Sequence, residues 1–189
     1  MFSGDFIIIK SMIADENNYA YIDNRNIYLG VRNLGWKLDF AKFRRYLLEK
    51  YSVKKAYMFI GYVEAHKDIY EDFAEQGYEC VFKQTTTLGG EIKGNVDAEL
   101  VLKCALDIDE FDKAVIVTGD GDFGCLIEHL EVNNKLKKVL PVSSKNCSFI
   151  IKKLITQENN FLDFLEYKSS LLGYTNEKGS AVGQNPKRT

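Results

Sequence analysis

Short apolar runs alternate along the chain with longer segments in which apolar positions recur at helical spacing. The runs of strand length occupy residues 19–22, 55–61, 78–83, 113–118 and 137–142. The segments with helical spacing occupy residues 26–34, 39–50, 66–76, 96–106, 123 to about 133, 147–154 and 159–171. A period near 3.6 residues predicts an amphipathic helix, and a short apolar run bounded by turn residues is consistent with a buried strand. The chain is therefore predicted to alternate strands with helices.

Residues at the ends of these segments support the same assignment. Asp39 precedes a predicted helix, where its carboxylate can accept a backbone hydrogen bond as an N-cap. Gly35 and Gly77 follow two predicted helices, at the position where glycine commonly ends a helix. Pro141 has no backbone N–H, so the last strand is expected to lie near a sheet edge or to end there. Residues 84–95 are polar, rich in threonine and contain glycines, so we expect an exposed loop.

Alternation of this kind predicts an α/β fold in which helices cover both faces of a central sheet. The sheet is expected to be mainly parallel, with about five strands, because apolar strands covered on both sides are typical of parallel sheets. No internal repeat and no second core are visible in the sequence. We therefore expect one domain over residues 19–172, an N-terminal extension over 1–18, and a disordered C-terminal tail over 173–189.

Composition places the chain among globular proteins and argues against a broadly disordered chain. It has 189 residues, of which 46% are hydrophobic and 28% charged, and its formal net charge is -2. That charge gives no overall basic character that would indicate nucleic-acid binding, but local basic patches can still hold phosphates. The four cysteines are scattered and the chain has two histidines, which argues against structural zinc and for reduced core thiols.

The N-terminal residues do not read as a membrane span or a signal peptide. Their apolar run is interrupted by Lys10 and is too short to cross a bilayer. Asp5 lies where a signal peptide would carry positive charge. We therefore expect a soluble, cytoplasmic protein.

Four aspartates are the candidate catalytic and metal-binding residues. Asp23 ends the first predicted strand, Asp97 opens a helix, and Asp120 and Asp122 follow the strongest apolar strand, residues 113–118. Ligands of open α/β sheets bind beyond the carboxyl ends of the strands, so these carboxylates are expected to meet there. Carboxylates that lie close together repel one another, and hard cations such as Mg²⁺ or Mn²⁺ relieve that repulsion. Such an ion suits phosphodiester hydrolysis by a metal-activated water.

The same residues also have simpler interpretations, because aspartate is common in turns and at helix N-caps. Asp97 can act as a cap alone, and we interpret Asp109, Asp112 and Asp163 as caps or solvated charges. For Asp120 and Asp122 a cap is the weaker explanation, since glycines surround both acids directly after a buried strand.

Three further residues are candidates for substrate binding or support of the site. Asn26 follows Asp23 by three residues and either orients its carboxylate or caps a helix. Lys93 lies in the glycine-bearing loop before Asp97 and either contacts phosphate or is an exposed loop lysine. Thr118 ends a strand, where its hydroxyl can bond a metal ligand or a substrate oxygen.

With these motifs in view, the chain resembles the NYN domain family, particularly its LabA-like branch, over roughly residues 19–167. The matching residues are Asp23 and Asn26 in the first motif, Lys93, Gly94, Val96 and Asp97 in the second, and Thr118, Gly119, Asp120, Gly121, Asp122 and Phe123 in the third. The second motif carries one extra residue, and the third has threonine where the family has serine. All three motifs occur in the family's order, which makes the resemblance specific.

The resemblance implies a three-layer PIN-like (Rossmannoid) fold and RNA cleavage assisted by Mg²⁺ or Mn²⁺. It implies that the four aspartates are metal ligands or orient water, that Asn26 and Thr118 support them, and that Lys93 contacts phosphate. The expected partner is RNA, most readily single-stranded, and a homodimer is left open. Basic residues that can guide the RNA backbone are Arg25, Arg32, Lys145 and Lys152.

One departure from the family keeps other functions open. Many members carry a further aspartate about two turns into the helix that begins near Asp97, where this chain has Lys103 and Cys104. Glu99 is a poor substitute, because it lies two residues beyond Asp97 and residues at that spacing point to different sides of a helix. A non-catalytic RNA-binding or regulatory protein is therefore an alternative. A haloacid-dehalogenase-like phosphatase is a weaker one, because Asp23 is followed two residues later by Arg25 and not by a second aspartate.

Overall fold

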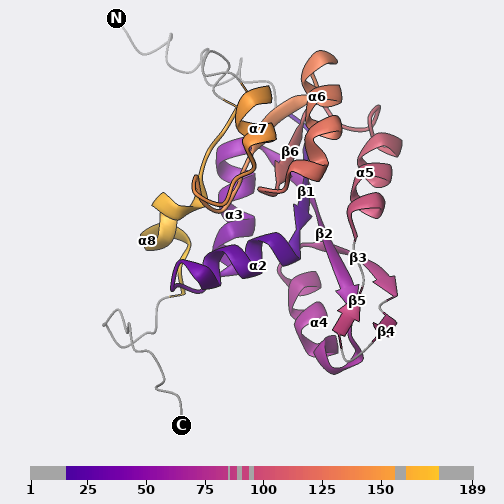
Figure 1. Cartoon of the computed structure of the whole chain (residues 1–189), viewed down its shortest axis with the longest axis vertical. Helices are drawn as coiled ribbons and strands as arrows, with labels where there is room; N and C mark the ends of the chain where they lie inside the picture. The colour runs from indigo at the N-terminus through magenta and orange to yellow at the C-terminus, as the bar shows by residue number, and fades with distance from the viewer. Residues whose placement is uncertain (1–15, 85, 89–90, 94–95, 156–160, 175–189) are drawn as a thin grey trace, which may run out of the picture.

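A computed structural model describes residues 16–84, 86–88, 91–93, 96–155 and 161–174 of the chain (Figure 1). Its strands are β1 (Asn18–Asp23), β2 (Val53–Tyr62), β3 (Glu79–Gln84), β4 (Thr86–Leu88), β5 (Glu91–Lys93), β6 (Ala114–Val117) and β7 (Leu136–Val139). Its α-helices are α2 (Asn24–Asn33), α3 (Phe40–Tyr51), α4 (Lys67–Glu75), α5 (Asp97–Leu106), α6 (Gly124–Val132), α7 (Phe149–Leu154) and α8 (Ser169–Leu172). Short 3-10 helices cover Glu64–His66, Gly121–Phe123 and Leu165–Lys168.

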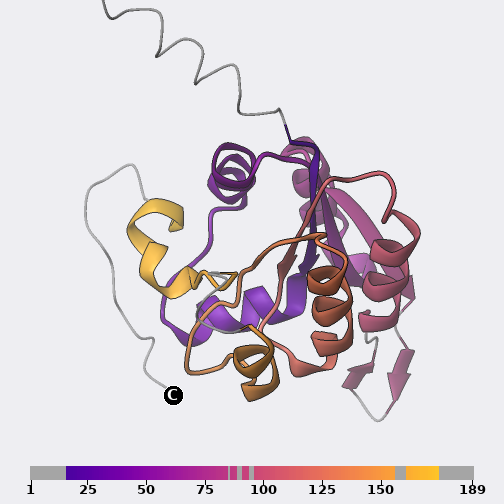
Figure 2. The same cartoon turned by 90° about the horizontal axis from the view of Figure 1, so that it is seen from above.

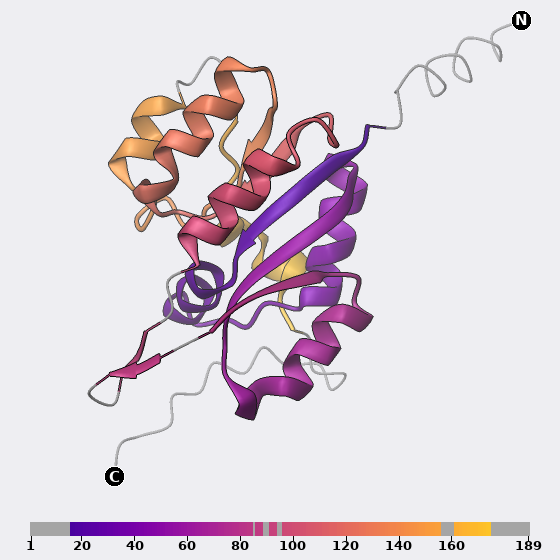
Figure 3. The ribbon, with the colours of Figure 1, turned by 90° about the vertical axis from the view of Figure 1, so that its right-hand side faces the viewer.

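The central sheet has five strands in the order β3-β2-β1-β6-β7, and every pairing in it is parallel. Helices α5, α6 and α7 cover one face, while α2, α3, α4 and α8 cover the other (Figures 2 and 3). The predicted three-layer α/β fold with a parallel sheet of about five strands is confirmed.

Strand β1 shows how the sequence fills both layers. Its side chains alternate between the faces, so Tyr19 and Tyr21 join the core under α5 and α6. Ala20 and Ile22 join the core under α2 and α3. Every residue of β1 is buried, which explains why this strand appears as a continuous apolar run and not as a polar–apolar alternation.

The order of the strands fixes where a ligand site can form. From β1 the chain runs outward through β2 to β3, and it then returns to the other side of β1 with β6 and β7. The order of connection therefore reverses between β1 and β6. In open α/β sheets the ligand crevice lies at such a reversal, beyond the carboxyl ends of the two strands. Asp23 ends β1, and Thr118 follows the last residue of β6.

Several predicted element ends are confirmed in atomic detail. The Asp39 carboxylate caps α3 by accepting a hydrogen bond from the backbone N–H of Lys42 at 3.0 Å. Gly35 and Gly77 have φ angles of 79° and 85°, the left-handed conformation that glycine adopts after a helix. Strand β7 is an edge strand and ends before Pro141, as its missing N–H led us to expect.

Two predictions about elements are wrong. Residues 84–95 contain an antiparallel hairpin, β4 with β5, which projects from the body of the protein (Figure 3). The threonines and Ile92 favour strands.

The predicted helix over 159–171 is the second error. In its described part, residues 161–164 are extended beside β7, where Val139 donates to the Phe161 carbonyl and Asp163 donates to the Val139 carbonyl. Only Leu165–Lys168 and Ser169–Leu172 are helical. Pairing with this segment satisfies backbone hydrogen-bonding groups at the exposed edge of β7. Local periodicity in the sequence does not predict such a tertiary contact.

The predicted ends of the domain lie largely outside the described residues. This holds for residues 1–15 and 175–189, so the proposed extension and tail remain predictions. At the near end of the tail, Tyr174 donates a backbone hydrogen bond to the Lys37 carbonyl at 2.9 Å. Across the part of the chain that is described, no helix has the length and apolar character needed to span a bilayer.

Candidate active site

Asp23 lies at the reversal point of the sheet and is 6% exposed. Its Oδ1 atom accepts the backbone N–H of Asn26 at 3.0 Å, so Asp23 is also the N-cap of α2. Its Oδ2 atom accepts the hydroxyl of Thr118 at 3.3 Å. Each carboxylate oxygen keeps a second lone pair, so both remain able to coordinate a cation.

The Thr118 hydroxyl connects two strands of the sheet. It donates to Asp23 at the end of β1 and accepts the backbone N–H of Asp120 at 3.2 Å. Thr118 is fully buried, so these bonds fix the position of Asp120 relative to Asp23. The residue that the sequence assigned a supporting role thus contacts two of the four candidate carboxylate residues.

Asp120 and Asp122 follow β6 in a tight turn. The Oδ1 atom of Asp120 accepts the backbone N–H of Asp122 at 3.1 Å and caps the 3-10 helix Gly121–Phe123. Both side chains are exposed and line a shallow cleft together with Asn26, Asn146 and Ser148. The turn therefore presents two carboxylates to solvent beside the buried Asp23.

The electrostatics of Asp23 show which acids lie near it. Burial raises the pKa of the Asp23 carboxyl above its usual value, and the charges of Asp97 and Asp120 raise it further. The hydrogen bonds from Asn26 and Thr118 act in the opposite direction but do not cancel this effect. The structure therefore brings acids from β1, α5 and the turn after β6 within electrostatic range. Asp122 is joined to them through its bond to Asp120.

No cationic side chain of the described residues pairs with Asp23. Across the same residues, no three His, Cys, Asp or Glu side chains already form a group that could hold a metal ion. Mg²⁺ does not need such a cage, since it keeps several waters and is commonly held by one or two carboxylates plus substrate phosphates. The carboxylates of Asp23, Asp120 and Asp122 are hard oxygen donors and fit that mode of binding.

Helix α5 does not replace the acid that the sequence motif lacks. Glu99 forms an ion pair with Lys83 of β3 at 2.9 Å. Lys103 pairs with Asp107 at 2.6 Å, and Cys104 is fully buried. These residues serve the packing of α5 against the sheet, so they add no carboxylate to the cleft.

The other candidates take different places. The side-chain Oδ1 of Asn26 accepts a hydrogen bond from the backbone N–H of Gly119 at 3.0 Å, and the backbone N–H of Asn26 donates to Asp23. Lys93 ends β5, three residues before Val96, and its side chain lies outside what the structure describes. Arg25, Arg32, Lys145 and Lys152 are all exposed.

Sequence reasoning missed Asn146 and Ser148, which line the cleft from the segment that follows β7. That segment leaves the sheet at the same edge as Asp120. The rule that ligands lie beyond the carboxyl ends of strands was therefore the signal that could have identified both residues.

Comparison with known proteins supports the fold. The fold is similar to the crystal structure of a protein of unknown function from Vibrio parahaemolyticus, with a TM-score of 0.63 and 20% sequence identity. The similarity covers 75% of this chain and 90% of that chain. No curated protein matches this chain in sequence.

The sequence model of the NYN domain matches residues 19–166, a range that contains all seven candidate residues. NYN domains belong to the PIN-like nuclease superfamily, are associated with RNA, and typically use divalent metal ions. Because the match spans most of the chain, this protein belongs to the NYN domain family.

Proposed function

We propose that this protein is a metal-dependent ribonuclease that hydrolyses RNA phosphodiester bonds at the cleft beside Asp23. The observation that carries the proposal is the buried Asp23 carboxylate, which lies within electrostatic range of Asp97 and Asp120 and pairs with no cationic side chain of the described residues. A divalent ion would compensate that charge and would at the same time bind a phosphate oxygen of the RNA. The LabA-like branch of the family is the one that the motifs support best.

In this proposal Asp23, Asp97, Asp120 and Asp122 hold Mg²⁺ or Mn²⁺ directly or through water. The bound ion supplies polarisation of a phosphate oxygen and a lower pKa for an attacking water. Thr118 and the backbone of Asn26 keep Asp23 in place through the bonds described above. We assign Lys93 to the RNA backbone.

Two further parts of the proposal concern the setting of the protein. A cytoplasmic location is supported by the cysteines, all four of which are free thiols, Cys104 and Cys147 in the core. Thiols of this kind are typical of a reducing compartment. RNA, most readily single-stranded, is the proposed partner, and a homodimer stays a prediction that solution mass measurements can test.

A non-catalytic RNA-binding protein is the second candidate. It is favoured by α5, where Lys103 and Cys104 occupy the region of the family's additional aspartate. Such a protein would bind RNA in the presence of chelator and leave it intact with metal. The family match gives no support to the phosphatase alternative.

The decisive assay compares cleavage of labelled single-stranded RNA with Mn²⁺ and with EDTA. We expect chelator-sensitive cleavage by the wild type and its loss in Asp120→Asn and Asp122→Asn. Asparagine can replace Asp120 as the cap of the turn, because its side-chain oxygen can still accept the N–H of Asp122.

The matched control is Asp109→Asn, which removes the same charge from an exposed residue in the turn before β6. This turn lies at the amino-terminal end of β6, whereas the cleft lies at its carboxyl end. This variant should cleave RNA as the wild type does. Equal cleavage by all four proteins would reject the assigned site, and RNA binding without any cleavage would favour the second candidate.

A further inference from the structure

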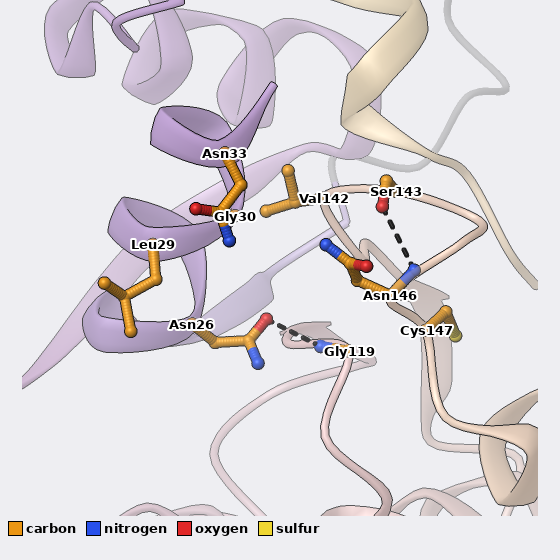
Figure 4. Close-up of a pocket in the computed structure, with 9 residues that line it drawn as sticks. All are labelled: Asn26, Leu29, Gly30, Asn33, Gly119, Val142, Ser143, Asn146 and Cys147. Atoms are coloured by element: carbon orange, nitrogen blue, oxygen red, sulfur yellow. Dashed lines mark hydrogen bonds between the residues drawn. The ribbon is translucent and has the colours of Figure 1, made fainter. Parts of the chain in front are cut away.

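A second cavity adjoins the acidic cleft, and none of the four candidate aspartates lines it. It lies between α2 and the segment after β7 (Figure 4). Its lining residues are Asn26, Leu29, Gly30, Asn33, Gly119, Val142, Ser143, Asn146 and Cys147. Three of them, Asn26, Gly119 and Asn146, also line the cleft of Asp120 and Asp122. The two spaces therefore lie side by side.

The walls of the cavity are fixed on both sides of Gly119. Its backbone N–H donates to the Asn26 side chain of α2 at 3.0 Å. Its carbonyl accepts the backbone N–H of Ser148 from the opposite wall at 2.9 Å. Gly119, which follows β6, thus connects both walls at the end of the cavity nearest the carboxylates.

A tight packing contact closes the cavity farther along α2. A Cβ atom added to Gly30 would lie 2.7 Å from the Cβ of Val142, so only glycine lets the helix approach this closely. The segment after β7 is itself held in a turn, since Ser143 accepts the backbone N–H of Asn146 through its hydroxyl and that of Cys147 through its carbonyl. The cavity is a built feature of the fold.

The chemistry of the lining selects a neutral, hydrogen-bonding ligand. None of the nine lining residues carries a charge. The side-chain amides of Asn33 and Asn146 make no hydrogen bond to any other described residue, and Figure 4 shows them on opposite walls. Each amide offers one acceptor and two donors, while Leu29 and Val142 supply apolar surface.

The size of the cavity restricts the ligand further. Its volume is about 190 Å³. That is space for roughly six water molecules and is below the range of about 300–1,000 Å³ that is usual for drug-sized ligands. A single planar ring with polar edges fits such a space, and a charged phosphate would instead be placed beside the carboxylates and their metal.

We infer that this cavity is a nucleobase subsite, in which Asn33 and Asn146 read the edge of one unpaired base next to the scissile phosphate. The inference rests on the proposed ribonuclease function. Single-stranded RNA presents unstacked bases whose edges are available to side-chain amides. The protein therefore has a base preference at one position beside the cut.

The test digests a random-sequence single-stranded RNA to low conversion with Mn²⁺ and sequences the new ends. The proteins compared are the wild type, Asn33→Ala with Asn146→Ala, and the control Asn133→Ala, whose amide caps the far end of α6. We expect a base preference in the wild type that falls about tenfold in the double variant, the discrimination typical of amide–base contacts. The control should keep the wild-type preference.

An unchanged preference in the double variant, or no preference in the wild type, would overturn the subsite. A second measurement separates this failure from failure of the nuclease proposal. If the wild type does not cleave RNA, binding of AMP, GMP, CMP and UMP in EDTA decides. Base-selective binding that the double variant loses supports the subsite without the nuclease, whereas absent or unaltered binding rejects the subsite as well.

Discussion

A single hydroxyl group links the two strands that end at the candidate site. Thr118 donates to Asp23 and accepts from the N–H of Asp120, so it holds both residues in one relative position. Residues that orient metal ligands in this way contribute strongly to metal affinity without touching the metal. The role can be tested apart from that of the carboxylates.

Thr118→Val keeps the shape of the side chain and removes the hydroxyl. We expect Mn²⁺-dependent RNA cleavage to fall about 10–100-fold, with a higher Mn²⁺ concentration needed for half-maximal activity. Thr118→Ser restores the hydroxyl and should retain most of the activity. Full activity of the valine variant at low Mn²⁺ would show that the hydroxyl has no orienting role.

At the scale of residues, the sequence predicted the acids near the reversal of the sheet but not the cavity beside them. Asp23, Thr118 and Asp120 could be placed together because each follows a recognisable apolar strand. Asn33 and Asn146 could not, because their proximity depends on the approach of α2 to the segment after β7. That approach is set by the contact of Gly30 with Val142, which is 112 positions later in the chain.

At the scale of elements, one interaction network joins α3 to the extended segment 161–164. Asp163, which we had interpreted as a cap or a solvated charge, is partly buried and bonded to four side chains instead. Its carboxylate accepts hydrogen bonds from Tyr46 and Tyr51 of α3 and pairs with Lys50 and Lys168. The interpretation was wrong because the three partners in α3, Tyr46, Lys50 and Tyr51, are more than a hundred residues away in sequence.

This network predicts a pH dependence of stability. Burial alone would raise the pKa of Asp163, but hydrogen bonds from Lys168, Tyr51 and Tyr46 outweigh it and hold the pKa well below its usual value. Because the pKa of Asp163 is lower in the folded protein, its ionised form stabilises the fold at pH values above the unfolded pKa of about 3.9. This contribution to stability is lost as the pH falls through the folded pKa.

Asp163→Asn should therefore lower the free energy of unfolding by roughly 2 kcal/mol at pH 7, the usual range for hydrogen bonds to a charged group. The difference from the wild type should shrink as the pH falls below about 4. Urea denaturation at several pH values measures it, with Asp109→Asn as the charge control. A difference that is constant with pH would contradict the role of the charged form.

The elements themselves divide according to how local their determinants are. Helix α3 was predicted from its N-cap and its period, and both signals come from the helix or the residue directly before it. The segment 161–164 was mistaken for a helix because its conformation is decided by pairing with Val139 of β7. Local propensity is a weak guide wherever such a tertiary partner exists.

At the scale of the whole molecule, the site opposes folding in the absence of a cation. A carboxylate as buried as Asp23, next to Asp97 and Asp120, costs free energy that the rest of the fold must offset. Functional sites commonly carry such a cost. A divalent ion that binds the folded protein should relieve it and stabilise the whole domain.

Thermal unfolding with Mn²⁺ and with EDTA therefore tests the metal site without RNA. At a Mn²⁺ concentration 100 times the dissociation constant, binding adds about 2.7 kcal/mol, which raises the melting temperature of a domain of this size by roughly 5–10 °C.

Asp120→Asn removes one charge beside Asp23 and keeps the acceptor for the N–H of Asp122. In EDTA this variant should melt at or above the wild-type temperature, and Mn²⁺ should stabilise it little. Asp109→Asn should respond to Mn²⁺ as the wild type does. If Mn²⁺ left the wild type unchanged, or stabilised Asp120→Asn equally, the repulsion among these acids would not be the feature that binds the metal.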